Sequence, residues 1–244
     1  MRLEIVALSG IPDVHRGDDI ASLIRDAAKR DQQPLDGSVV LAVAQKIVSK
    51  AEGAIVDLRE IQPSALAQSW ATDWDKDPRL IELILSQSKR IIKMDRGVLI
   101  AETHLGCVSA NAGVDQSNLE GDDFASVLPK DPDASAARLR AELGCGAVII
   151  TDTFGRPWRE GLVDVAIGCT GLAPLEDYRG SLDRRGRKLT GTILAVADQL
   201  AAAAGILMRK PVGCPVVLMR GLDWKHSQDS ARALIRSRKQ DLFR

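Results

Sequence analysis

A carboxylate and a hydroxyl, Asp152 and Thr153, follow an apolar, β-branched run at positions 147–151. Such a run predicts a buried strand, and functional groups concentrate where a strand gives way to a loop. We therefore expect Asp152 and Thr153 at a strand end. The glycine and proline that follow predict a loop, which carries Arg156, Arg159 and Glu160. Oxygen ligands beside arginines suit a metal ion and a phosphate better than a packed core.

Two other stretches carry related chemistry. The segment at 102–118 is small and polar with little periodicity, and long loops inside a compact domain are usually functional or disordered. Its glycines, Asp115 and Asn118 favour a ligand-binding loop. Lys46 and Lys50 follow a second apolar run at 39–43 and could hold an anionic ligand, although solvated lysines explain that stretch equally well.

Together these residues form an oxygen set and a basic set. The oxygen set is Asp115, Asp152 and Thr153, to which either Glu160 or Asp164 could be added. The basic set is Lys46, Lys50, Arg156 and Arg159. A metal ion and several cations around an anion are the apparatus of phosphoryl transfer. Surface ion pairs and helix caps explain most of these residues singly, but the convergence of three strand ends favours a site.

Familiar catalytic motifs are absent from the sequence. There is no GxxxxGK[ST] or GxGxxG nucleotide loop, no HExxH and no GxSxG. The four cysteines lie far apart without a CxxC pair, which argues against a zinc site or disulfide framework. His104 lies three positions before Cys107, and we interpret this pair as incidental.

Composition narrows the class of protein. Across 244 residues the formal net charge is zero, whereas nucleic-acid-binding chains usually show a basic surplus. No apolar segment reaches the ~20 residues of a membrane helix, and the first residues lack a signal-peptide pattern. We therefore expect a cytoplasmic protein that binds neither nucleic acid nor membrane.

The elements that must position the site alternate between strands and helices. The patterns predict strands at 3–8, 39–43, 147–151, 163–167 and 216–219, and a hairpin over 91–100 that turns at 95–97. They predict helices at 20–30 (capped by Asp18 or Asp19), 58–74, 79–89, 135–143 (capped by Asp133 or Ser135) and 193–208, and a helical tail from 225 on. Without clean βα units or a linker, we expect one domain, 1–244, with a mixed α/β fold.

Several long runs give the chain a specific resemblance. They are GIP at 10–12, QKIVSKAEG at 45–53, ANAGVDQSN at 110–118, LPKDPDASA at 128–136 and TDTFGRPWREGLVDVAIG at 151–168. In order and spacing the chain resembles the coenzyme F-420-0:γ-glutamyl ligase family. The resemblance implies an unusual ligase-specific α/β fold without a P-loop, with two interleaved lobes and an intertwined homodimer.

The resemblance also implies an activity. Such a ligase uses GTP, with Mg²⁺ or Mn²⁺ and assistance from K⁺, to join L-glutamate to a deazaflavin precursor of coenzyme F-420. Further glutamates follow through γ-linkages. The implied route passes through an acyl phosphate and releases GDP and phosphate. Two alternatives stay open: a related nucleotide-dependent amide ligase for another carboxylate, and a non-catalytic nucleotide- or deazaflavin-binding protein.

Residue roles are implied by matching positions. Asp115 and Asp152 would be catalytic residues and ligands of a first metal, with Thr153 on a second metal. Arg156, Arg159 and Glu160 would be substrate-side or structural groups. The implied nucleotide-binding residues are Ile11, Pro12, Asp13, Val14, Gln45, Lys46, Lys50, Asn118, Met208, Arg209 and Lys210.

Three positions depart from the family pattern. A histidine is expected at Leu105, an acid is common at Gly205, and no oxygen side chain stands at Arg209 and Lys210. A second metal near Lys210 would therefore need backbone carbonyl or water oxygens.

Overall fold

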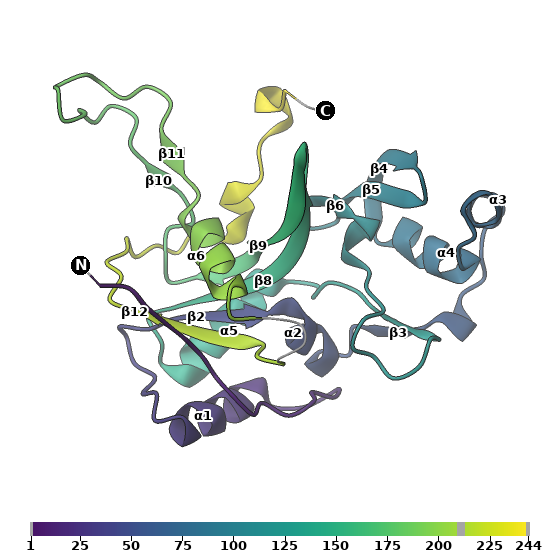
Figure 1. Cartoon of the computed structure of the whole chain (residues 1–244), viewed down its shortest axis with the longest axis horizontal. Coiled ribbons are helices and arrows are strands. Elements are labelled where there is room, and N and C mark those ends of the chain that lie inside the picture. Colours follow the sequence, from purple (N-terminus) through teal and green to yellow (C-terminus); the bar gives the residue numbers. More distant parts are fainter. Residues whose placement is uncertain (1, 209–212, 243–244) are drawn as a thin grey trace.

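A five-stranded sheet forms the centre of the computed structural model, which describes residues 2–208 and 213–242. Its strand order is β1-β12-β2-β8-β9, and β2 and β8 are parallel whereas the other neighbours are antiparallel (Figure 1). The strands are β1 Glu4–Ala7, β2 Val40–Ala44, β8 Ala147–Arg156, β9 Arg159–Thr170 and β12 Val216–Arg220.

Helices cover both faces of this sheet. Because successive side chains on a strand point to opposite faces, Leu41 and Val43 pack with α1 (Ile20–Arg30) and α5 (Pro132–Leu143). Val40 and Ala42 pack with α6 (Val196–Gly205) on the other face. Burial on both sides explains why these strands read as continuous apolar runs. The mixed α/β prediction is confirmed.

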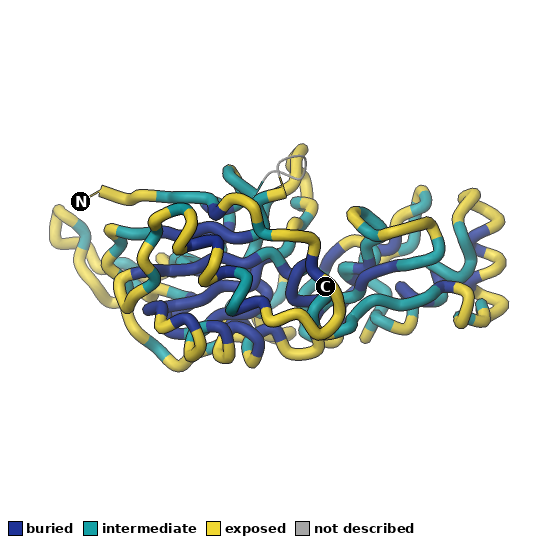
Figure 2. The backbone as a smooth tube through the Cα atoms, turned by 90° about the horizontal axis from the view of Figure 1, so that it is seen from below, coloured by how far each residue is buried: buried dark blue, intermediate teal, exposed yellow. Residues whose placement is uncertain are grey.

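A second group of elements has its own hydrophobic cluster, which includes Leu58, Trp70, Ile84 and Leu99. It lies beside the large sheet in Figure 1, and Figure 2 shows buried backbone in both parts. Its strands are β3 Ile55–Asp57, β4 Ser88–Asp95, β5 Val98–Thr103, β6 Val108–Ala110 and β7 Phe124–Ser126. Its helices are α3 Ala65–Trp74, α4 Pro78–Ser86 and the 3₁₀ turns η1 Leu58–Glu60 and η2 Asn111–Gly113.

The remaining elements are peripheral or short. The strands β10 (Glu176–Asp177) and β11 (Ile193–Leu194) pair at the base of an arm that projects from the molecule (Figure 1). Up to residue 242 the tail contains two 3₁₀ turns, η3 (Ala231–Leu234) and η4 (Arg238–Gln240), and no α-helix, so the prediction of a helix from residue 225 on is wrong for the described part of the tail. Within residues 2–208 and 213–242, no helix has the length and apolarity needed to cross a membrane.

The predicted strand end before Asp152 is wrong. β8 continues through Asp152 and Thr153 to Arg156, because β9 pairs with it as far as Arg159, with shifts in register at Ile150/Thr151 and Gly155/Arg156. The side chains beyond Thr151 are no longer fully buried, so this part of the hairpin lacks the apolar pattern of a core strand. The proline therefore marks a hairpin turn rather than the start of a long loop.

Several helix boundaries also differ from the prediction. The helix predicted at 58–74 is split by Pro63 into η1 and α3, and Ser64 caps the latter by accepting from the Ala67 N–H. The helix predicted at 79–89 ends at Ser86, and β4 begins two residues later, at Ser88. The helix predicted at 193–208 begins at Val196, after the short strand β11.

The helix caps show one success and one error. Helix α1 spans Ile20–Arg30 as predicted, and Asp19 caps it. Helix α5 begins three residues earlier than predicted and is capped by Asp131 instead of Asp133 or Ser135. Pro132 occupies its first turn, where the missing N–H costs no hydrogen bond.

Candidate active site

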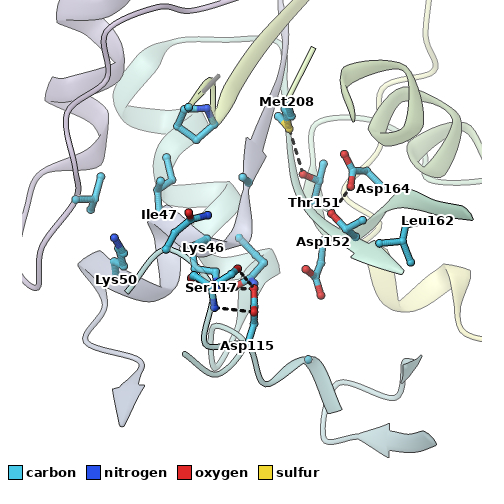
Figure 3. A pocket seen from close by; sticks show the side chains of 18 of the residues that line it. Lys46, Ile47, Lys50, Asp115, Ser117, Thr151, Asp152, Leu162, Asp164 and Met208 are labelled. Carbon is cyan, nitrogen blue, oxygen red and sulfur yellow. Dashed lines mark hydrogen bonds and ion pairs between the residues drawn. The ribbon is translucent and has the colours of Figure 1, made fainter. Parts of the chain in front are cut away.

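One cavity of about 570 Å³ gathers most of the predicted site residues (Figure 3). It lies where β2 gives way to α2 (Gln45–Ala51), with the β8–β9 hairpin on one side and the segment after β6 on the other. Its volume is within the range of small-molecule sites. Its lining includes Ile11, Pro12, Asp13, Val14, Gln45, Lys46, Lys50, Ser109, Asp115, Ser117, Asn118, Asp152, Thr153, Phe154, Gly155, Leu162, Asp164 and Met208.

Lys46 is held by three oxygens on the first side of the cavity. Its Nζ donates to Asp115 Oδ2 (2.8 Å), Ser126 Oγ (2.9 Å) and the Ser117 carbonyl oxygen (3.2 Å). These acceptors use all three ammonium hydrogens. The backbone of Asp115 is itself fixed by a bridge to Ser126. Lys46 and Asp115 therefore form a positioned ion pair.

The pKa of Asp115 reflects these contacts. Burial opposes its charge, but hydrogen bonds from the Lys46 ammonium and from the Ser117 hydroxyl and N–H hold the pKa of this carboxyl below its usual range. Asp115 is thus a stable carboxylate at neutral pH, with its charge balanced inside the protein.

Lys50 lies one helical turn after Lys46 on α2, so both lysines project from one face of the helix. Its ammonium makes a 2.6 Å ion pair with Asp13, whose side chain is 61% exposed. The contact also keeps the pKa of Asp13 low. An exposed partner of this kind can be displaced by a ligand anion at little cost.

Asp152 has the opposite electrostatic character. Burial raises its pKa to about 6, and the Thr153 N–H, the Gln45 side chain and Lys46 only partly offset this. The nearby negative charge of Asp115 adds to the rise. Ser49 Oγ lies 2.8 Å from Gln45 Oε1 and 2.7 Å from the Val127 carbonyl oxygen, so its one hydrogen is shared between two acceptors next to the Gln45 amide. Asp152 therefore carries a charge that the protein alone does not balance.

The hydroxyl of Thr153 lies on the same strand and donates to Asp164 Oδ1 at 2.6 Å. The two residues are directly opposite in the β8–β9 ladder. Of the two acids that could be added to the oxygen set, Asp164 lines the cavity and Glu160 does not. Figure 3 shows Asp152 and Asp164 on one side of the cavity, with Lys46 and Asp115 on the other.

The donor set fits a hard cation that is completed by a ligand. In the part of the chain that the structure describes, no three or more His, Cys, Asp or Glu side chains are grouped closely enough to hold a metal ion. Mg²⁺ is usually held by one or two carboxylates together with substrate phosphates and water. Asp115 and Asp152 with the Thr153 hydroxyl match that sparse set, and the unbalanced charge of Asp152 calls for a cation.

The predicted nucleotide-binding residues meet in this cavity with two omissions. Every one of them from Ile11 to Asn118, and also Met208, is in its lining. Met208 sulfur accepts from Thr151 Oγ1 at 3.6 Å. Arg209 and Lys210 lie outside the described residues.

The three residues predicted as substrate-side or structural lie at the hairpin tip and are not in the cavity lining. The Arg156 guanidinium donates to the carbonyl oxygens of Glu160 and Gly161, so it ties the turn together. The side chains of Arg159 and Glu160 are exposed. These contacts favour the structural alternative for Arg156.

Some lining residues escaped the sequence analysis. Ser117 lies two residues after Asp115, and Asp-x-Ser is a spacing at which the hydroxyl and N–H can bond back to the carboxylate. That signal was available. Ser126, Phe154 and Leu162 carry no such signal, because only the folded sheets bring them to the cavity.

Comparison with known proteins agrees with this geometry. The model of the F420-0:Gamma-glutamyl ligase family matches residues 10–221. The coenzyme F420:L-glutamate ligase of Methanothermobacter thermautotrophicus is 44% identical over 252 residues, which cover 100% of both chains. Its namesake from Methanopyrus kandleri is 44% identical over 254 residues, with 100% of this chain and 98% of the relative covered. That from Methanocaldococcus jannaschii is 39% identical over 219 residues, 87% of each chain. The chain therefore belongs to the F420-0:gamma-glutamyl ligase family.

Proposed function

We propose that the chain is a GTP-dependent ligase that joins L-glutamate to the F-420 precursor and then adds further γ-linked glutamates. The observation that carries the proposal is the composition of one cavity in a chain of this family: two carboxylates, a threonine hydroxyl and two lysines converge there. The curated relatives bear the name coenzyme F420:L-glutamate ligase. The chemistry of the cavity suits a nucleoside triphosphate and a divalent cation.

The residues divide the work between phosphate and cation. Lys50 would bind a phosphate after displacement of the exposed Asp13, while Lys46 keeps Asp115 in place. Asp115, Asp152 and Thr153 would hold Mg²⁺ or Mn²⁺. When bound, the cation supplies charge neutralisation for the transferred phosphoryl group. The Gln45 side chain, which hydrogen-bonds the Asp152 carboxylate, would help to keep that carboxylate in place for the cation.

The reaction proposed for this cavity has two steps. A precursor carboxylate oxygen attacks the γ-phosphorus of GTP, the bond to the β-phosphate oxygen breaks, and GDP leaves. The amine of L-glutamate then attacks the carbonyl carbon of the acyl phosphate, inorganic phosphate leaves, and the nitrogen loses a proton. Positioning and charge stabilisation supply most of the catalysis in such transfers.

The same resemblance extends the proposal to K⁺ as an assisting ion and to a homodimer in the cytoplasm. The four cysteines form no disulfide in the part of the chain that the structure describes, which suits a reducing compartment. Size-exclusion chromatography with light scattering tests the dimer, and replacement of K⁺ by Na⁺ tests the ion.

The decisive assay combines the purified protein with deazaflavin precursor, L-glutamate, GTP and Mn²⁺, and reads added glutamyl units by mass spectrometry. We expect a ladder of products with GTP and none without L-glutamate. ATP in place of GTP tests the nucleotide preference. Absence of any mass gain would refute the precursor assignment and favour an amide ligase that acts on another carboxylate.

The acyl phosphate has its own test. Oxygen-18 in the precursor carboxylate should appear in the released phosphate, and hydroxylamine should trap the activated carboxylate. If no label transfers while glutamate is still ligated, the two-step route is wrong although the ligase assignment stands.

A further inference from the structure

The Thr153–Asp164 pair lies in the hairpin beyond the buried part of the sheet. Thr153 is exposed and Asp164 is half-buried, and both line the cavity. A cross-strand pair at such a position contributes only about 0.2–1 kcal/mol to folding. The 2.6 Å contact is nevertheless a charge-assisted hydrogen bond, which is short and directional. The contact therefore matters more for how Thr153 meets a ligand in the cavity than for the stability of the fold.

The hydrogen bond determines what Thr153 can offer a ligand. A hydroxyl has one hydrogen and two lone pairs. Because its hydrogen is committed to Asp164 Oδ1, Thr153 presents only an acceptor to the cavity. An acceptor suits a cation and repels a phosphate oxygen. Loss of a group that orients a metal ligand in this way typically costs about 10- to 100-fold in metal affinity or activity.

Gly205 shows that the fold leaves room for this carboxylate. It is the last residue of α6, and a Cβ built on it would lie 2.2 Å from Asp164 Oδ2. The three heavy atoms nearest to that Cβ, outside the helix's own backbone and the chain neighbours, all belong to the Asp164 side chain. Its backbone is not in the left-handed region, so conformation does not require glycine here.

A hydrogen bond also joins α6 to β9. Asp198 on α6 accepts from the Ala166 N–H of β9 at 3.0 Å. This contact holds the first turn of α6 against β9, and Gly205 lies at the other end of the same helix, next to Asp164 on the same strand. Space for the Asp164 carboxylate is therefore a property of the packed fold.

We propose that Asp164 is a positioning residue of the active site: it holds the Thr153 hydroxyl as a cation acceptor, and Gly205 keeps the space for its carboxylate. The inference deepens the proposed function and rests on it where it concerns ligation. Its cation-binding part concerns this chain's own residues and can be tested alone.

The experiment compares wild type with Asp164→Ala, Asp164→Asn, Gly205→Ala and the double variant Gly205→Ala/Asp164→Ala. The affinity for Mn²⁺ alone is measured by electron paramagnetic resonance of the free ion, and kcat and the apparent KM for Mn²⁺ are measured in the ligation assay. Asp177→Ala, which removes an exposed carboxylate paired with Arg179 on the distant arm, is the matched control.

We expect Asp164→Ala to weaken Mn²⁺ binding about 10- to 100-fold, with unchanged circular dichroism and Tm. Asp164→Asn should lose less, because its amide oxygen still accepts from Thr153. Gly205→Ala should resemble Asp164→Ala, since the new methyl group displaces the flexible carboxylate. The double variant should be no worse than Asp164→Ala alone, because the two changes remove the same hydrogen bond.

Each other outcome is decisive. The inference would be overturned if Asp164→Ala bound Mn²⁺ as tightly as wild type, or if wild type bound no Mn²⁺. It would also be overturned if the loss of Mn²⁺ affinity in the double variant equalled the product of the losses in the two single variants. If wild type fails to ligate glutamate while Asp164→Ala weakens Mn²⁺ binding, the proposed function fails and the positioning role stands.

Discussion

The two sides of the cavity solve the same electrostatic problem in opposite ways. Asp115, on the segment after β6, has its charge balanced by Lys46 and its pKa held low. Asp152, in the middle of β8, is half-buried without an equal partner, and its pKa rises to about 6. Lys46 acts on both carboxylates, but it contacts Asp115 directly at 2.8 Å.

The two sides therefore differ in whether their charges are balanced without a ligand. We call the side with Lys46 and Asp115 the finished side, and the side with Asp152, Thr153 and Asp164 the unfinished side. On the finished side, the Lys46 ammonium and the Asp115 carboxylate have their charges balanced and their hydrogen bonds made before any ligand arrives. The β8–β9 side holds an uncompensated carboxylate and an acceptor hydroxyl, which a cation would satisfy. Such tension between folding and function is common where a site must bind charge. Three substitutions test the contrast.

The largest effect is expected for Asp152→Asn. The neutral amide removes a ligand from the proposed cation site, so we expect ligation to fall by about 10³-fold or more. The same change removes a buried charge, so the ligand-free protein should become more stable at neutral pH. Urea denaturation and the ligation assay on one preparation measure both effects. Retained ligation would refute the role of Asp152 in holding the cation.

The stability difference between Asp152→Asn and wild type should depend on pH in a defined direction. The folded-state pKa of Asp152, about 6, lies above its unfolded value, so stability from this group is present below pH 4 and is lost as pH rises to about 6. The total is on the order of 2–3 kcal/mol. Asp152→Asn should therefore be more stable than wild type above pH 6, with an advantage that shrinks toward pH 4. An equal advantage at both ends would show that burial does not cause the effect.

A smaller effect is expected for Lys46→Met, which breaks the finished side. It leaves the partly buried Asp115 carboxylate without its cation, and we expect a loss of roughly 1–3 kcal/mol in unfolding free energy. Lys50→Met is the matched control on the same helix: its partner Asp13 is 61% exposed, so the loss should stay below about 1 kcal/mol. Equal losses in urea denaturation would contradict the contrast between the two lysines.

The sequence predicted the finished side and the unfinished side with unequal success. Lys46, Lys50 and Asp115 follow ordinary signals, because they stand after an apolar strand or in a glycine-rich segment. Asp152 and Thr153 were predicted at the site but in the wrong structure, since β8 continues past them. A strand that leaves the core loses the apolar pattern from which strands are recognised. Only pairing with β9 reveals it.

Contacts between segments that are distant in the sequence could not be predicted either, because they too depend on how the chain is folded. Ser126 reaches Lys46 because β7 lies beside the Asp115 backbone. Gly205 reaches Asp164 because α6 packs on β9. Neither contact produces a local sequence pattern, because both depend on how two sheets and a helix pack together. Local chemistry, such as the Asp19 cap of α1, was predictable because donor and acceptor lie three residues apart.

The smallest effect is expected at the hairpin tip, which marks where the unfinished side ends. Trp158 has a φ of +59° and is 82% exposed, a conformation that costs a non-glycine residue roughly 1–2 kcal/mol. Trp158→Gly should therefore raise unfolding free energy by about 0.5–1 kcal/mol after the entropy that glycine loses on folding. Asp75→Gly, at the left-handed end of α3, should give a similar gain and serves as control. Because the tip residues Arg156, Arg159 and Glu160 are not in the cavity lining, kcat and KM should stay unchanged in Trp158→Gly. A rise in KM for the deazaflavin precursor alone would instead extend the substrate-binding surface along the hairpin to its tip.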